Sequence, residues 1–242
     1  MIPWRATTCA LAVALVAAGA AAQSVTGTQG LLSVPTARMH ADGTLVIGTG
    51  YVDRAYSTHQ NGTADYTPLY ASLTFLPSVE IGFRFTRALD APGTQALGDR
   101  MFLARVRVLE EGPAWPAVAV GAHDFLRSSS RSTQFFNALY AVASKRVGLG
   151  ELSGWEPAVD LHAGWGTDLI DASGHQFVGP FGGVAVEMSP QGGIVRQIAL
   201  LAEYDGSTVS VGPRIEVAGV VLTAGIQGFR VPIAAAAVRV GL

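Results

Sequence analysis

Apolar and polar residues alternate along much of this chain. The stretch from 208 to 217 reads TVSVGPRIEV, in which apolar side chains recur at every second position among polar, small or charged ones. The stretches 79–86, 101–109, 159–166 and 220–228 repeat the pattern. A period of two places alternate residues on opposite faces of a β-strand. The pattern therefore predicts an all-β protein whose strands each have one apolar face.

Over the whole chain, the alternation predicts twelve antiparallel strands, an even number. The connections between them tend to alternate in length, from 8–15 residues at 54–68, 88–100, 126–133 and 168–180 to two residues at 77–78 and 218–219. Short turns at one end and longer loops at the other are typical of bacterial outer-membrane barrels. The strands are expected at 45–53, 69–76, 79–87, 101–109, 117–125, 134–146, 158–167, 181–188, 196–204, 208–217, 220–228 and 233–241.

The composition of the two faces favours a membrane protein. A soluble β-sandwich would show the same alternation, so periodicity alone leaves both architectures open. The polar faces carry small residues and charges of both signs, whereas the apolar faces are almost free of charge. A wet lumen and a lipid-facing wall require this division. We expect an antiparallel transmembrane β-barrel, with the soluble sandwich as the alternative.

Seven charged residues are expected to face the lumen. They either form a selectivity path for an acidic or neutral glycan or neutralise one another inside a filled lumen. A twelve-stranded barrel lies between the small filled barrels and the open porins, so both interpretations stay open. The seven residues are Glu80, Arg84, Arg105, Arg107, Asp160, Arg214 and Glu216. Four aromatic residues near strand ends suit an aromatic girdle: Trp115, Trp155, Trp165 and Tyr204.

The segment 23–44 has no alternation and is rich in turn-forming residues. Unpaired backbone groups in hydrocarbon cost several kcal/mol each, so this segment must lie in the periplasm or inside the lumen. We expect it to plug the periplasmic mouth, with Gly30 and Pro35 fixing its path. Arg38 and Asp42 are then expected to meet lumen charges. The expected partners are Glu111, Glu187 and Arg107.

Residues 1–22 are typical of a cleavable secretory signal peptide. Arg5 precedes the apolar run ALAVALVAA, and three alanines end the segment. Cys9, the one cysteine, would leave with the signal, which excludes disulfides and cysteine-bound metals in the mature chain. We expect residues 45–242 to form one outer-membrane barrel domain in a Gram-negative bacterium.

Composition excludes several other classes of protein. The 242 residues are 49% hydrophobic and 14% charged, with a formal net charge of −2. A chain without excess positive charge has no field to attract a phosphate backbone, so nucleic-acid binding is not expected. Intrinsic disorder requires low hydrophobicity and high net charge, which is the reverse of what is found.

One arrangement suggests an enzyme. His123 and Asp124, followed by the serines at 128–130, could form a hydrolase site at the outer rim. Adjacent strand residues point to opposite faces, so His123 and Asp124 do not easily share an active site. The five histidines show no metal-binding spacing: His40, His59, His123, His162 and His175. We therefore expect no catalytic residue, no metal and no cofactor.

Several motifs resemble those of the YjbH-like outer-membrane proteins associated with exopolysaccharide production. The densest is TQGLLSVPTAR at 28–38, followed by DGTL at 42–45. Six further motifs fall in the family's order. They are RVRVLEEG at 105–112, PAVAVGAHDF at 116–125, ASKR at 143–146, GWG at 164–166, FGG at 181–183 and EYD at 203–205.

The resemblance implies an outer-membrane barrel that takes part in exopolysaccharide export or assembly, without cofactor or catalysis. The partners it implies are outer-membrane lipid, an extracellular polysaccharide and a periplasmic polysaccharide-export protein. Two alternatives remain for the function. One is an outer-membrane hydrolase acting on lipid or glycan at the outer rim. The other is a structural or glycan-binding barrel without transport.

Overall fold

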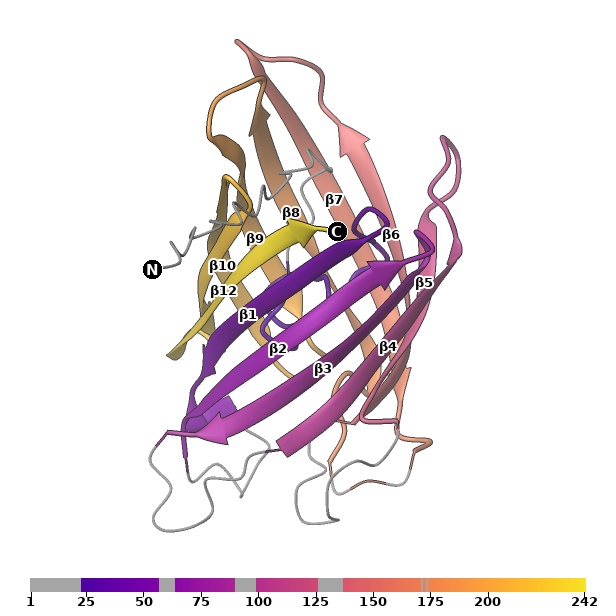
Figure 1. Ribbon diagram of the computed structural model, residues 1–242, viewed down its shortest axis with the longest axis vertical. Helices are drawn as coiled ribbons and strands as arrows, with labels where there is room; N and C mark the ends of the chain where they lie inside the picture. Colours follow the sequence, from indigo (N-terminus) through magenta and orange to yellow (C-terminus); the bar gives the residue numbers. More distant parts are fainter. Residues whose placement is uncertain (1–22, 57–63, 90–98, 126–136, 171, 173) are drawn as a thin grey trace, which may run out of the picture.

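The computed structural model describes residues 23–56, 64–89, 99–125, 137–170, 172 and 174–242. These residues form a closed antiparallel barrel of twelve strands (Figure 1), which confirms the predicted fold and strand number. The expected signal peptide, 1–22, lies outside the described residues. The strands are β1 (Thr44–Val52), β2 (Tyr66–Phe75), β3 (Val79–Ala88), β4 (Asp99–Leu109), β5 (Ala117–His123), β6 (Ala138–Gly148), β7 (Trp155–Thr167), β8 (Gly179–Pro190), β9 (Val195–Tyr204), β10 (Val209–Val217), β11 (Val220–Gln227) and β12 (Val231–Gly241).

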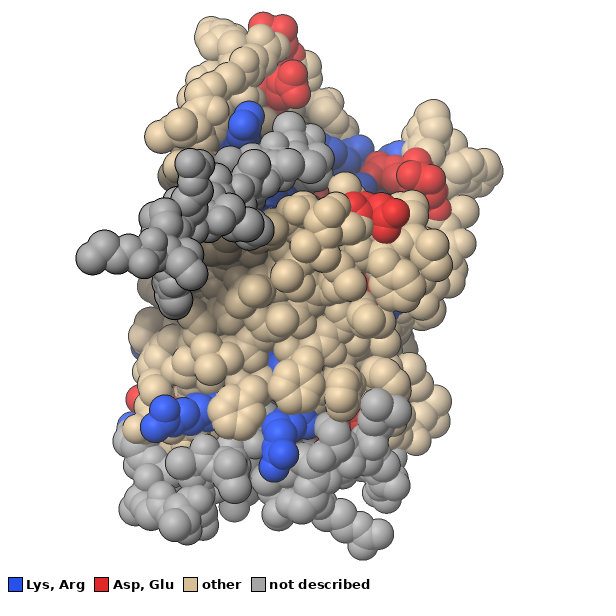
Figure 2. All heavy atoms as spheres, in the orientation of Figure 1, with Lys and Arg blue, Asp and Glu red and all other residues tan. Residues whose placement is uncertain are grey.

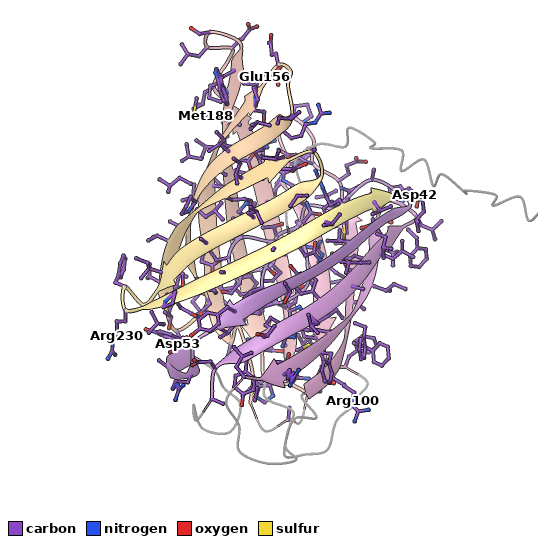
Figure 3. The ribbon with its side chains drawn as sticks, turned by 60° about the vertical axis from the view of Figure 1, so that its left-hand side comes forward. Asp42, Asp53, Arg100, Glu156, Met188 and Arg230 are labelled. Atoms are coloured by element: carbon purple, nitrogen blue, oxygen red, sulfur yellow. The ribbon has the colours of Figure 1, made fainter. Side chains whose placement is uncertain are left out.

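Each strand pairs with the next, and β12 pairs with β1 to close the sheet. Because the first and last strands are neighbours, the closed sheet rules out the two-sheet sandwich. Thr44 pairs with Gly241, so the barrel begins and ends at one end, here called the terminal end. Figure 3 places Asp42 and Glu156 there, and Asp53, Arg100 and Arg230 at the opposite, loop end.

The outer face of the wall is apolar. A broad, largely uncharged zone separates the charged residues of the two ends in Figure 2. Exposed aliphatic and aromatic side chains make up this zone; examples are Ile47, Leu69, Ile81, Phe83, Phe102, Leu161, Val186, Leu200 and Leu222. Two of the expected girdle aromatics flank it, Trp115 before β5 at the terminal end and Trp165 on β7 at the loop end. In the described part of the chain, no helix is long and apolar enough to span a membrane.

Glycines on the inner face make room for tyrosines of the neighbouring strands. Gly48 pairs with Tyr70, and Gly121 pairs with Tyr140. A Cβ atom at either glycine would lie 2.5 Å from the opposing ring, so no larger residue fits without displacing it. Cross-strand covering of glycine by an aromatic ring is a known means of fixing strand register. These two glycines thus serve the packing of the inner wall.

The N-terminal segment lies inside the barrel. Residues 24–37, which form neither a helix nor one of the twelve strands, are all buried, and Arg38 after them is half-buried. Leu31 and Leu32 pack among Ala185 and Leu201 of the wall, and Val34 packs in a cluster of wall residues further round the barrel. We call residues 23–40 the plug. The hydrophobic core of this protein therefore lies between the plug and the inner wall, where side chains of the two pack together.

Candidate functional site: the filled lumen

The plug is bound to the wall through its own backbone. The carboxylate of Glu203 on β9 accepts hydrogen bonds from three successive backbone amides, those of Leu32 at 2.9 Å, Ser33 at 2.9 Å and Val34 at 3.1 Å. The Ser33 hydroxyl donates a further bond to the same carboxylate. Successive amides that converge on one point form a concave anion site. Here the anion is a side chain of the barrel wall.

Three arginines of the wall bind the plug's carbonyl groups. Arg214 donates to the carbonyls of Gly30 and Leu31, at 2.7 and 2.5 Å. Arg105 donates to three plug carbonyls, including that of Gln29 at 2.9 Å. The third arginine, Arg84, donates to the carbonyl of Thr26 at 3.2 Å.

This arrangement provides bonds to the plug's backbone in addition to those that the plug makes within itself. An irregular buried segment has amides and carbonyls without ladder partners, and each unpaired group is costly. The carbonyls meet guanidinium groups and the amides meet a carboxylate. Some wall charges also pair directly, as in Arg105 with Glu80. The inward charges therefore pair with one another and also bind the plug's backbone. Neither of the two interpretations of these charges from the sequence included bonds to the plug's backbone.

At the terminal end, the plug leaves the lumen through a cluster of charges. Arg38 binds both carboxylate oxygens of Asp160, at 2.9 and 2.6 Å, and also pairs with Glu111. Burial acts to lower the pKa of Arg38, but its bonds to these two acids outweigh burial and raise it. Burial opposes ionisation of Glu111, but bonds from Arg38 and from the backbone amide of Arg146 lower its pKa. Arg38 and Glu111 are thus both charged at neutral pH.

The structure places the predicted lumen residues as follows. Six are buried on the inner face: Glu80, Arg84, Arg105, Asp160, Arg214 and Glu216. Arg107 instead lies at the end of β4, where it donates to the carbonyl of Pro77 at 3.0 Å. It lies at the rim because β4 ends at Leu109, and the β4–β5 register shifts beside it.

The predicted plug residues also separate into two groups. Gly30 and Pro35 form a bridge that holds a tight turn, and Arg38 meets Glu111 as expected. The expectation for Asp42 is wrong. Its side chain is exposed at the terminal end (Figure 3) and enters none of the ion pairs found among the described residues. Asp42 lies just before β1 begins, where the chain has already left the lumen.

The inner wall brings together a serine, a histidine and an aspartate. The sequence does not predict that these three residues are close to one another. The Oγ atom of Ser144 is 2.8 Å from Nδ1 of His162, whose Nε2 lies 3.8 Å from Asp160. The residue types are those of a hydrolytic triad. However, Ser144 accepts the amide of Ala37, and Asp160 holds Arg38. This set binds the plug.

The structure gives little support to the hypothesis of a hydrolase site at the outer rim. His123 is fully buried, and its ring packs edge-on against Tyr140 and Phe177 at centroid distances of 5.4 and 6.0 Å. Its partner serines, 128–130, lie outside the described residues. Within the described part of the chain, no group of three potential metal ligands occurs; His59 falls outside that part. His123 is a member of the aromatic core.

His40 in the plug makes the barrel's stability sensitive to acid. Burial, and then repulsion by Arg239 and Arg105, lower its pKa to about 3. The neutral ring bonds Gln23 at 3.3 Å. In the unfolded chain its pKa is 6.5, so the unfolded state takes up the proton first as pH falls. Between pH 6.5 and about 3, each pH unit should lower the free energy of unfolding by about 1.4 kcal/mol.

The test compares urea unfolding of the full chain and of His40→Gln at pH 7 and pH 4.5. Glutamine keeps a donor for Gln23 but does not titrate. The variant should therefore lose less stability on acidification than the parent. An identical loss in the two proteins would show that His40 is not buried in this way.

These features define a plugged β-barrel: a closed sheet whose lumen is filled by the N-terminal part of the same chain. The sequence profile of the family described as exopolysaccharide biosynthesis protein YbjH matches residues 22–209. The chain belongs to this family, which confirms the resemblance in its motifs. It is 32% identical over 152 residues to an uncharacterized lipoprotein, YjbH, of Escherichia coli (strain K12). That match covers 60% of this chain but only 18% of the lipoprotein.

Proposed function

We propose that this protein is a non-enzymatic outer-membrane β-barrel that takes part in exopolysaccharide export or assembly. The observation that carries the proposal is a closed barrel with an apolar outer face in a member of an exopolysaccharide biosynthesis family. A wall of this kind needs lipid around it, because a soluble monomer rarely exposes so large an apolar surface. The outer membrane is where such barrels occur.

The filled lumen favours an accessory role over that of an open conduit. Leu31, Leu32 and Val34 lie inside the barrel and are at most 2% exposed. A polymer cannot pass while these side chains are in place. The barrel would then act beside a periplasmic export protein, or would open only when the plug is displaced.

The experiment is deletion of the coding gene from its own bacterium, with polysaccharide measured separately in the medium and in the cells. We expect less secreted polymer, with polymer retained in the cells, and recovery when the gene is restored. Unchanged secretion would contradict the proposal. Polymer of altered chain length, with normal amounts secreted, would favour the hydrolase alternative.

Membrane placement is tested by arginine substitution on the outer face. Val186 lies in the middle of β8 and Val209 at the loop end of β10, and they are similarly exposed, at 46% and 42%. Arginine at the bilayer midplane costs about 2–4 kcal/mol, and near the interface about 0–1 kcal/mol. Val186→Arg should therefore destabilise the barrel in lipid vesicles far more than Val209→Arg, measured by urea unfolding. Equal losses would contradict a lipid-facing wall.

A further inference from the structure

A cavity of about 200 Å³ lies at the loop end of the lumen, beside the plug. Its walls come from strands β3 and β11, from Tyr56 of the short 3-10 helix Arg54–Tyr56, from Asp205 after β9, and from the plug itself. Val25, Thr26 and Ser33 are the plug's contributions. The cavity is distinct from the charge cluster through which the plug leaves the lumen at the terminal end.

Three of the residues that line the cavity have a side-chain polar atom without a hydrogen-bond partner in the described part of the chain. The hydroxyl of Thr86 and the side-chain carbonyl oxygen of Gln227 have no hydrogen-bond partner there, although the two residues are only 3% and 5% exposed. The side-chain carbonyl oxygen of Gln176, a half-buried residue, also has no partner there. Buried polar groups are nearly always bonded, so these three groups, which belong to one cavity, are the ones that a polar ligand there would bond.

The other lining groups limit the ligand's chemistry. Arg84 and Asp205 line the same cavity, so a strongly charged ligand of either sign would meet one group of its own sign. An acyl chain would leave the buried hydroxyl and amides unbonded. Tyr56, Tyr66 and Phe177 supply aromatic surface. A neutral, compact molecule with several hydroxyl groups and apolar C–H faces satisfies both sets of groups.

We propose that this cavity binds one sugar unit of a polysaccharide, with Thr86, Gln176 and Gln227 bonded to its hydroxyl groups. The inference rests on the proposed function and assigns it a ligand site. Because plug residues form part of the cavity, the site is complete only while the plug is in the lumen. Sugar bound there stabilises the plugged state, since a ligand stabilises the conformation that binds it.

The test is calorimetric titration of the full chain in detergent micelles. The probe is a set of short oligosaccharides made by partial hydrolysis of the polysaccharide secreted by the same bacterium. Thr86→Val and Gln227→Leu each remove polar atoms without adding bulk. Each should weaken binding about five-fold, as expected for one hydrogen bond, and together about twenty-five-fold.

Thr74→Val is the matched control. Thr74 is also an inward-facing, buried threonine whose hydroxyl has no partner among the described residues, but it lies at the terminal end of β2, away from the cavity. This variant should bind the oligosaccharides as the parent does. Absence of binding by the parent, or equal binding by the parent and the double variant, would overturn the proposal.

Secretion is measured in parallel in the strain from which the gene has been deleted. If secretion requires the gene but the purified protein binds no oligosaccharide, the proposed function stands and the sugar site is wrong. If the oligosaccharides bind through Thr86 and Gln227 but secretion does not require the gene, the site stands and the proposed function is wrong.

Discussion

Deleting residues 28–40 is expected to convert a non-conducting barrel into a conducting one. These residues provide most of the contacts that fill the lumen, and the strands that form the wall do not include them. Water would replace the plug around the buried arginines and Glu203, so their charges would remain solvated. The measurement is single-channel conductance in a planar lipid bilayer, with the full chain as the control.

Folding of the deletion variant is checked by its migration on gels with and without heating, because folded barrels migrate differently until they are boiled. Unchanged conductance in a folded variant would mean that the segment acts elsewhere, for example as a docking strip for a periplasmic partner. Failure to fold would mean that the wall cannot form without the plug.

Replacing Glu203 by glutamine should loosen the plug while leaving the wall intact. The carboxylate accepts three backbone amides, and an uncharged amide presents its own donors to the same groups. Loss of two charge-assisted bonds corresponds to about 3 kcal/mol. Cleavage of the segment by added protease should then be about 100-fold faster, because cleavage follows the population of the open form.

Glu187→Gln is the control for this prediction. Glu187 is also a buried carboxylate on the inner wall, but it pairs across β7 with Arg146 of β6 rather than with the plug. It should change protease sensitivity of the plug far less than Glu203→Gln does. Equal sensitivity in the two variants would mean that loss of any inward charge loosens the barrel.

The strands can be predicted closely because a period of two leaves little freedom. A shift by one residue would turn every apolar side chain of a strand into the lumen. The differences lie at the strand ends, and some of them involve proline. The sequence predicts strands at 69–76 and 158–167, which leave out Pro68 and Pro157. Both residues lie inside β2 and β7, but within the first three residues, where one missing bond is tolerated.

The inward charges can be predicted from the same alternation, but their partners cannot. Glu203 binds amides that lie about 170 positions away along the chain, and only the closed barrel brings the two together. The contact between Ser144 and His162 cannot be predicted for a related reason, because the two residues meet only through the register of β6 with β7. Asp42 is placed wrongly because sequence does not show where an irregular segment leaves a lumen.

Hydrogen bonds between the plug's backbone and the inner wall are the central feature of this barrel. Hydrogen exchange of the full chain in micelles, followed for each backbone amide, tests them most directly. The amides of Leu32, Ser33 and Val34 donate to Glu203 and should exchange as slowly as those of the central strands. Exchange of these three amides at the rate of an unfolded peptide, with the strands still protected, would contradict a plug bound in the lumen.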